Sequence, residues 1–587
     1  MKNRSLLVSA SALFLSLGAA PGNGASPARN VYFGDLHLHT AYSLEVYAVD
    51  ITTTPDQAYR YARGESVLVD GAPVQRPFPL DFLAISDHAE HLGVLNGLSD
   101  PDSEVSQSAI GELMRREPAG MPRMWHLFEM LESGTPVPGF DERKAFAAGW
   151  RDYVAAANAN YLPGRFTTFI GYEWSGDTTS EYDLKQTNSL HRGVIFGGAT
   201  APLPFTSLDS HRPEDLWTYL EENRRRGIDV FAMANHPNLS GGLMYALQDS
   251  DGHPIDRAYA ERRALNEPLS EIAQHHGNSE THPSASPEDN FADFEISERL
   301  FLSQKKSPIA GSYVREAYGQ GLLLQQALGV NPFKFGVVGT SDFHNGLSDS
   351  VEGDYAGDTD GGINPRHPLT AQRLRHNLSR ANELNTIDMG SAYLTAVWAE
   401  QNTRESIFAA LKRKETYATS GTRLKLRFFG GWNYDRRSLR SKDWLRSAYL
   451  QGVPMGGDLP AIPAAAKAPR FIVWAHKAPE SVNLDRAQIV KLWIEDGRYR
   501  EHIFDVAIGG RPELAALWTD PGFDATTPAV YYLRVLELPT PRWTTIQSVK
   551  VGIPPPSDKP VSIQERGWSS PIWYVPSSAE HASCECR

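Results

Sequence analysis

The sequence predicts an α/β protein: a distorted barrel of about seven strands and their crossover helices, followed by an all-β, sandwich-like domain. Two observations lead to this fold class. Over roughly the first four hundred residues, short apolar runs alternate with longer polar or helical stretches, as in strands joined by helices. Farther along the chain, helical periodicity fades and alternating, aromatic-rich runs separated by turn residues take its place.

Seven apolar runs are the candidate barrel strands, each short and β-branched or aromatic at its middle. In chain order they are VYFGDLHLHT, DFLAISDHAE, FTTFIGYEWS, HRGVIFGG, DVFAMANHPN, LSEIAQHH and FKFGVVGTSDFH. A His, Asp or Glu stands at or just past the C-terminal end of nearly every run, although in HRGVIFGG the histidine leads. Because catalytic groups of such barrels gather at the C-terminal face, these ends predict one functional site.

Four segments are expected along the chain. Residues 1–26 combine a basic start, an apolar centre and small residues, which predicts a secretory signal peptide and a periplasmic or secreted protein. The barrel is expected over residues 27–421 and the β-rich domain over residues 422–578. Residues 579–587 form a dispensable tail with the only two cysteines, Cys584 and Cys586, which are too close for an unstrained disulfide.

Long excursions interrupt the predicted barrel at about residues 93–165 and 249–287. The first contains helical patterns such as MWHLFEMLESG and ERKAFAAGWRDYVAAANAN. Excursions of this length either shape a pocket or decorate the surface. For the β-rich domain, structural support, trimming of the substrate face and carbohydrate binding through its tryptophans all stay open.

The net charge of −13 argues against a nucleic-acid surface, which needs a basic footprint. No apolar run after the signal segment is long enough to cross a bilayer, so no membrane span is expected after its removal. A small anionic substrate stays compatible with this charge, because bound metal ions can reverse the charge inside one pocket.

Asp35, His37 and His39 occupy alternating positions of the stretch FGDLHLHTAYS. In a strand these positions share one face, so the three side chains should converge, and a cation is the natural partner. Matching groups stand at the later strand ends, as Asp87 and His88, Glu173, His191, His236, Asp342 and His344. Burying so many ionisable groups without compensation would cost several kcal/mol each, which favours bound metal ions.

With these motifs, the chain resembles the polymerase-and-histidinol-phosphatase (PHP) superfamily of trinuclear metal hydrolases. GDLHLHTAYS is similar to the first motif, ISDH to the second, Glu173 with the following His191 to the third, NHP to the next and SDFH to the last. TPDQAYRYARGE, GTSDFHNG and QERGWSSPIWY further resemble an exported PHP-like subfamily of undescribed function. The resemblance covers nearly the whole mature chain and implies a distorted (β/α)7 PHP-type barrel.

The resemblance also implies three neighbouring cation sites. Their ligands are, in order, His37, His39, Glu173 and Asp342; the bridging Glu173 with His191 and His236; and Glu45, His88 and His344. Relatives often have His or Asp where this chain has Glu45, and the longer carboxylate can still ligate. The histidine-rich set favours Zn, Mn or Fe over Mg or Ca, so two or three such divalent ions are expected.

Three divalent ions would bring six positive charges against three ligand carboxylates, so the pocket should attract a tetrahedral oxyanion. A bridging water with its pKa lowered to about 7 would then attack phosphorus, which predicts a metal-dependent phosphoesterase for phosphate mono- or diesters. The alternatives are hydrolysis of another ester (including sulfate esters), an amide or a lactone, and a non-catalytic metal- or ligand-binding protein.

Further residues are expected around the ligands. Asp35 and Asp87 are interpreted as groups that orient the imidazoles, with direct ligation as the alternative. The predicted catalytic residues are His276, to protonate the leaving oxygen, Arg192, to clamp a phosphate oxygen, and Glu280 beside them. For each of them the alternative is an ordinary hydrogen-bonded loop residue. Trp174 either stacks on an organic leaving group or, as favoured here, packs against the barrel.

Overall fold

The computed structural model describes residues 29–576, except for residues 70, 134, 177–187, 301–304, 350, 356, 358–368, 380–385 and 392. The predicted signal peptide and the tail with Cys584 and Cys586 therefore lie outside the described residues. No helix in the described part of the chain has the length and apolar character that a membrane crossing requires.

All seven predicted barrel strands are present, which confirms the apolar runs as strands. They are β1 (Asn30–Asp35), β4 (Phe82–Ile85), β5 (Thr167–Ser175), β6 (His191–Phe196), β7 (Val230–Ala234), β8 (Leu269–Gln274) and β10 (Gly336–Gly339). They pair in the order β10-β8-β7-β6-β5-β4-β1 as part of one mixed sheet of 15 strands. Nearly every residue of these strands is buried, which explains their continuous apolar character.

The strand β6 runs antiparallel to both β5 and β7, whereas β1, β4 and β5 are mutually parallel, as are β7, β8 and β10. Strands that alternate with crossover helices predict a parallel sheet, and for β6 this prediction is wrong. The reversal explains why His191 leads its run: the first residue of β6 lies opposite Ser175, the last residue of β5. His191 therefore reaches the same edge of the sheet as residues at the ends of the parallel strands.

The sheet curls until β10 meets β11 (Leu394–Ala399) and β12 (Thr416–Thr419). These contacts are not a backbone ladder. Thr395 Oγ1 donates to the carbonyl of Gly339 at 2.7 Å, and Thr416 Oγ1 donates to the carbonyl of Val337 at 2.9 Å. Closure into a seven-stranded barrel remains a prediction.

The C-terminal β region is antiparallel and continues the large sheet without a break, in the order β11-β12-β22-β19-β16-β17. A second sheet, β14-β13-β15-β18, packs beside it, and Phe471 of β15 meets Tyr531 of β19 with ring centroids 4.5 Å apart. The strands are β13 (Lys425–Gly431), β14 (Gly452–Pro454), β15 (Arg470–His476), β16 (Leu484–Glu495), β17 (Arg498–Arg511), β18 (Glu513–Thr519), β19 (Ala529–Glu537), β20 (Thr540–Pro541), β21 (Ser562–Ile563), β22 (Arg566–Ser569) and β23 (Ile572–Tyr574). Two helices, α12 (Trp444–Gln451) and α13 (Trp543–Val551), correct the expectation of a purely β region.

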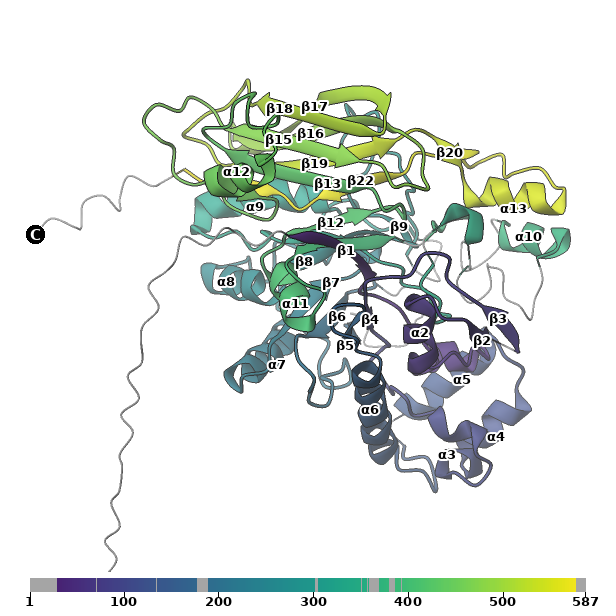
Figure 1. Cartoon of the computed structure of the whole chain (residues 1–587). Helices are drawn as coiled ribbons and strands as arrows, with labels where there is room; N and C mark the ends of the chain where they lie inside the picture. Colours follow the sequence, from purple (N-terminus) through teal and green to yellow (C-terminus); the bar gives the residue numbers. More distant parts are fainter. Residues whose placement is uncertain are drawn as a thin grey trace, which may run out of the picture.

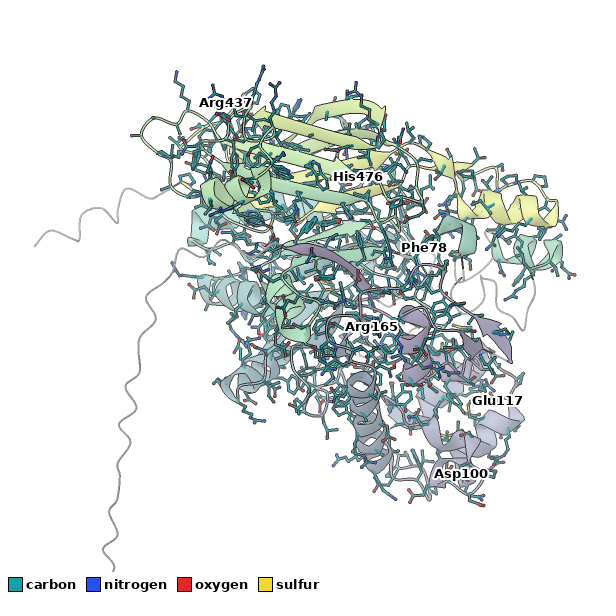
Figure 2. The ribbon with its side chains drawn as sticks, in the orientation of Figure 1. Phe78, Asp100, Glu117, Arg165, Arg437 and His476 are labelled. Carbon is teal, nitrogen blue, oxygen red and sulfur yellow. The ribbon has the colours of Figure 1, made fainter. Side chains whose placement is uncertain are left out.

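The predicted excursion over residues 93–165 is helical, and its buried apolar residues, such as Leu113 and Leu127, form one cluster with Leu44 and Ala48. It comprises η1 (Asn96–Ser99), α3 (Glu104–Gln107), α4 (Ala109–Arg116), α5 (Met121–Glu132) and α6 (Glu142–Ala159), and the last two confirm the helical patterns quoted above. Figure 1 shows α3–α6 at one end of the molecule and β15–β18 at the other. In Figure 2, Asp100 and Glu117 mark the helical end, while Arg437 and His476 mark the β end.

The remaining elements connect the strands. The helices are α1 (Leu44–Ala48), α2 (Pro55–Ala62), α7 (Pro213–Arg225), η3 (Pro237–Leu239), α8 (Arg257–Asn266), α9 (Val314–Leu328), η4 (Glu352–Asp354), α10 (Ala371–Asn377), η5 (Thr386–Asp388) and α11 (Arg404–Lys412). Of the short strands, β2 (Val67–Val69) pairs with β3 (Ala72–Val74), and β9 (Gly277–Asn278) pairs with β8.

Candidate metal centre

Four side chains from three distant parts of the chain meet where β1, β5 and β10 end. Nε2 of His37 and Nε2 of His39 lie 3.1 Å apart. Both contact Oδ1 of Asp342, at 3.1 and 3.2 Å, and each contacts one oxygen of Glu173, at 3.2 and 3.3 Å. All four residues are at most 1% exposed, so bulk water does not screen them.

The polar atoms of this group fit a bound cation. Nδ1 of His37 faces Oε1 of Glu271 at 2.7 Å and donates to it, so Nε2 is the nitrogen that points at Asp342. Burial lowers the pKa of His37, but the nearby carboxylates outweigh burial and raise that pKa well above its usual range, so a bound cation would replace a proton on this ring. Both oxygens of Asp342 and Oε2 of Glu173 are buried and accept no hydrogen bond from any described residue. Buried carboxylate oxygens and imidazole nitrogens that converge on one point are the arrangement of metal ligands.

The carboxyls of this group are held ionised. Burial raises the pKa of Asp342, but the imidazoles of His37 and His236 outweigh that effect and hold it well below its usual range. Burial likewise opposes ionisation of Glu173, and the imidazoles of His37 and His191 again bring its pKa well below normal. The pKa of His88 falls well below the usual value because burial disfavours its charged form. Anionic carboxylates and a neutral imidazole are the protonation states that ligate metals.

A second group adjoins the first through Glu173. The carboxylate lies 3.4 Å from Nδ1 of His191, 3.3 Å from Nε2 of His236 and 3.4 Å from Nδ1 of His88. Glu173 thus contacts imidazoles of both groups, as a bridging carboxylate does. His88 is closer to this group than the motif resemblance implied.

A third group adjoins His39 on its other side. The ring of His344 stacks on that of His39, with centroids 4.1 Å apart. Oε1 of Glu45 lies 3.9 Å from Nε2 of His344 and 3.9 Å from Nε2 of His88. The ligand atoms of these four residues all lie within 4.8 Å of one another, so the structure brings all nine predicted metal ligands into one connected cluster.

Six of the nine ligands stand on the connections that follow the strands, whereas Glu173 lies within β5, His191 begins β6 and Glu45 lies in α1. β1 ends at Asp35, and Leu38, between the two histidines, forms an isolated bridge with Phe343. His236 and Asp342 adopt left-handed backbone angles, with φ of 32° and 55°. Such angles are costly for residues other than glycine and cluster at functional sites.

Asp35 and Asp87 act on the backbone of these loops and not directly on imidazole rings, which corrects the expectation for them. Asp35 accepts from the backbone N–H groups of His37 and Ser341, both at 3.1 Å. Asp87 accepts from both the backbone N–H and the Oγ of Ser43, at 3.1 and 2.7 Å, and Ser43 Oγ in turn lies 3.0 Å from Nδ1 of His39. In the structure, Glu271 and Ser43 are therefore the groups that orient His37 and His39.

His276 lies at the cluster, as predicted, together with a neighbour that the prediction missed. Nε2 of His276 is 3.7 Å from Oδ2 of Asp342, and Nε2 of His275 is 3.9 Å from the same oxygen. The ring of His276 is parallel to that of His236, at a centroid separation of 6.3 Å. These two histidines extend the cluster beyond the first group.

Two predicted catalytic residues are engaged elsewhere. Arg192 is 2% exposed, and its Nε donates to Glu267 at 3.0 Å, so its guanidinium group is not available to a substrate phosphate. Glu280 is fully buried and accepts from Trp568 Nε1 at 2.6 Å, away from the metal ligands. Trp174 is fully buried as well, which supports packing over stacking on a leaving group.

Glu271 is the most informative residue that the prediction missed. It is fully buried in β8 and contacts two ligand residues: its Oε2 accepts the backbone N–H of His236 at 2.7 Å, in addition to the bond with His37. A charged residue inside the otherwise apolar strand LSEIAQ was the available signal. Asn235 was missed too, and its Nδ2 donates to Oε1 of Glu173 at 2.6 Å.

Comparison with known proteins gives a family and one solved structure. A family model described as a protein of unknown function, DUF3604, matches residues 26–512 and 509–576. No curated protein matches the chain. A crystal structure of a two-domain protein from Bacteroides vulgatus, described as containing a predicted PHP-like metal-dependent phosphoesterase, is 13% identical, covers 93% of this chain and 99% of its own, and has a TM-score of 0.27. The match of the family model over almost the whole described chain shows that the protein belongs to the DUF3604 family.

Proposed function

We propose that the protein is a metal-dependent hydrolase that cleaves phosphate mono- or diesters with water. The observation that carries this proposal is the group of His37, His39, Glu173 and Asp342, whose nitrogens and oxygens converge and are buried. Both oxygens of Asp342 and Oε2 of Glu173 accept no hydrogen bond from any described residue. The proposal includes a distorted (β/α)7 barrel, and the contact of β10 with β11, which pairs with β1, supports closure of the sheet.

Nine side chains would hold two or three divalent ions of Zn, Mn or Fe. The first set is His37, His39, Glu173 and Asp342; the second is Glu173, His191 and His236; the third is Glu45, His88 and His344. Bound in such sets, these ions lower the pKa of a water to about 7 and neutralise charge that develops on a phosphoryl group. Glu271 keeps the ring of His37 oriented, and Asn235 keeps the carboxylate of Glu173 oriented.

His276 is the proposed proton donor to the leaving oxygen. Its Nε2 lies 3.7 Å from Oδ2 of Asp342, and its side chain is 7% exposed, so it adjoins the first group and keeps a small contact with solvent. An imidazole can donate a proton at neutral pH when it reaches the leaving atom directly or through one water.

The charge of the cluster favours an anionic substrate. Three divalent ions would carry six positive charges, and the ligand carboxylates Glu45, Glu173 and Asp342 with the adjoining Glu271 would return four negative ones. A net positive, buried cluster in an acidic protein draws a small anion to one place. We therefore propose a small phosphoester as substrate, no nucleic-acid partner, and a periplasmic or secreted location after removal of residues 1–26.

The test is metal analysis of the purified protein, followed by assays of the metal-loaded protein on an aryl phosphate, an aryl phosphodiester, an aryl sulfate and a lactone. Asp342→Asn should lose both turnover and bound metal. Asp81→Asn is the matched control, because Asp81 is hydrogen-bonded to the backbone N–H of Phe33 at the opposite end of β4. Cleavage of only the sulfate or the lactone would assign another ester, and bound metal without any turnover would assign a binding protein.

A further inference from the structure

The two additional histidines of the cluster are the tip of a tight hairpin. β8 and β9 pair through Gln274 and Gly277, so His275 and His276 form the two-residue turn between them. Gly277 adopts φ of +111°, and a Cβ there would lie 2.8 Å from the side chain of Ser297. The turn therefore requires glycine, and it presents both imidazoles toward Asp342.

A buried carboxylate fixes the chain directly after this hairpin. Glu280 accepts hydrogen bonds from Tyr532 Oη at 2.6 Å, Arg534 Nη1 at 3.1 Å and Trp568 Nε1 at 2.6 Å, and from Arg315 Nη2 at 2.5 Å. Burial raises its pKa, but the guanidinium groups of Arg534 and Arg315 outweigh burial and bring the pKa to about 2. Three of these four donors belong to β19 and β22 of the C-terminal β region.

A second set of bonds fixes the hairpin from its other side. Arg542, which precedes α13, binds both carboxylate oxygens of Glu295, at 2.8 and 2.7 Å, and the carbonyl of Met389 at 2.7 Å. The carbonyl of Glu295 accepts the N–H of Asn278 in β9 at 2.9 Å. Gly390, next to Met389, donates its N–H to the carbonyl of His275 at 2.7 Å.

We propose that the C-terminal β region is a positioning element of the metal centre, and that Glu280 and Arg542 are the residues through which it holds His275 and His276 in place. This inference rests on the proposed function and deepens it. The β region then acts on the reaction without touching the substrate. A hairpin displaced by about 1 Å would move both imidazoles relative to Asp342, and displacements of that size can cost about 100-fold in rate.

The chain offers a matched pair of substitutions. Glu280 and Asp289 both bind Arg534 and Arg315, and both are buried, but only Glu280 adjoins the hairpin. In Glu280→Gln the amide NH2 must face at least one of the four donors. At least one of the hydrogen bonds that fix the chain after the hairpin is therefore lost. Asp289→Asn removes the same charge from the same two arginines nine positions farther along the chain.

The experiment compares wild type, Glu280→Gln, Asp289→Asn and Arg542→Lys. Hydrogen exchange at the amides of residues 275–279 should accelerate at least tenfold in Glu280→Gln and Arg542→Lys, and change less than twofold in Asp289→Asn. In the metal-loaded protein, kcat should fall about 10- to 100-fold in Glu280→Gln and Arg542→Lys, with KM changed less than threefold. Arg542→Lys keeps the charge and serves the test if Glu280→Gln does not fold.

Equal exchange at these amides in all three variants and wild type would overturn the proposal, as would equal acceleration in Asp289→Asn. The exchange measurement needs neither substrate nor turnover. If the wild-type protein cleaves no phosphoester, the proposed function fails while the exchange result still decides whether the β region holds the hairpin.

Discussion

Glu271→Gln is the substitution that tests the metal centre most directly without removing a ligand. Oε1 of Glu271 accepts from Nδ1 of His37 at 2.7 Å and from Oγ1 of Thr340 at 2.6 Å, and Oε2 accepts from the N–H of His236 at 2.7 Å. A glutamine has one acceptor oxygen, so whichever way its amide turns, its NH2 faces a donor. At least one of these bonds is lost.

The size of the effect follows from the bond that is lost. A hydrogen bond to a charged group contributes about 1.5–3 kcal/mol, and each 1.4 kcal/mol is tenfold in an equilibrium constant. Metal affinity should therefore fall about 10- to 100-fold, which agrees with the usual cost of changing a carboxylate that orients a metal-bound imidazole. Because His37 and His236 belong to different ligand groups, the loss should affect more than one ion.

The assay is titration of the metal-free protein with Zn²⁺ or Mn²⁺, together with urea unfolding. Glu267→Gln is the control, since Glu267 is also buried but pairs with Arg192 and Arg263 and not with the cluster. It should unfold about 3 kcal/mol more easily while binding metal normally. Metal affinity of Glu271→Gln within threefold of wild type would refute the reasoning.

Three other predictions concern pH, substrate contact and metal removal. His91 lies 2.5 Å from Glu142, and the nearby carboxylates of Glu132 and Glu142 raise its pKa to about 9 against the effect of burial. The charged form of His91 therefore stabilises the fold fully below about pH 6.5, and this stabilisation is lost as the pH rises through about 9. His91→Gln should lower the free energy of unfolding by about 2 kcal/mol at pH 6 and by much less at pH 10. Urea midpoints of wild type and variant that differ equally at both pH values would contradict this prediction. Arg192→Lys should lower the unfolding midpoint and leave KM for a phosphoester within twofold, whereas a tenfold rise in KM would restore Arg192 as a phosphate clamp. A chelator should lower the thermal unfolding free energy by about 2.7 kcal/mol relative to protein with free metal at 100 times Kd, and unchanged scanning calorimetry traces would argue against a resident metal.

The positions of the strands were predictable because buried strands consist mainly of apolar residues. The runs that became β1, β4, β5, β7, β8 and β10 are covered on both faces, so they read as continuous apolar segments. The direction of β6 was not predictable, because an apolar run carries no sign of whether its neighbours run parallel or antiparallel to it. The leading position of His191 was the one local hint of the reversal.

The C-terminal region shows a different limit. Its alternating runs predicted β13, β15, β16, β17, β19 and β23, but the pairing of β12 with β22 joins this region to the large sheet. That pairing brings Ser569 next to Tyr417, about 150 residues away along the chain. Long-range pairing of this kind depends on packing of the whole molecule, and no window of the sequence contains it.

The sequence by itself determined which residue types stand at the strand ends, and hence that they gather at one edge of the sheet. Because β1 and β10 stand at opposite ends of the order β10-β8-β7-β6-β5-β4-β1, the curl of the sheet decided that His37 and His39 meet Asp342. Only the tertiary structure decided the partners of each polar side chain: Glu271 orients imidazoles, whereas Arg192 and Glu280 are consumed in buried ion pairs. The physical reason is that a charge's role depends on which opposite charges lie within a few ångströms of it. Those neighbours come from segments hundreds of residues apart.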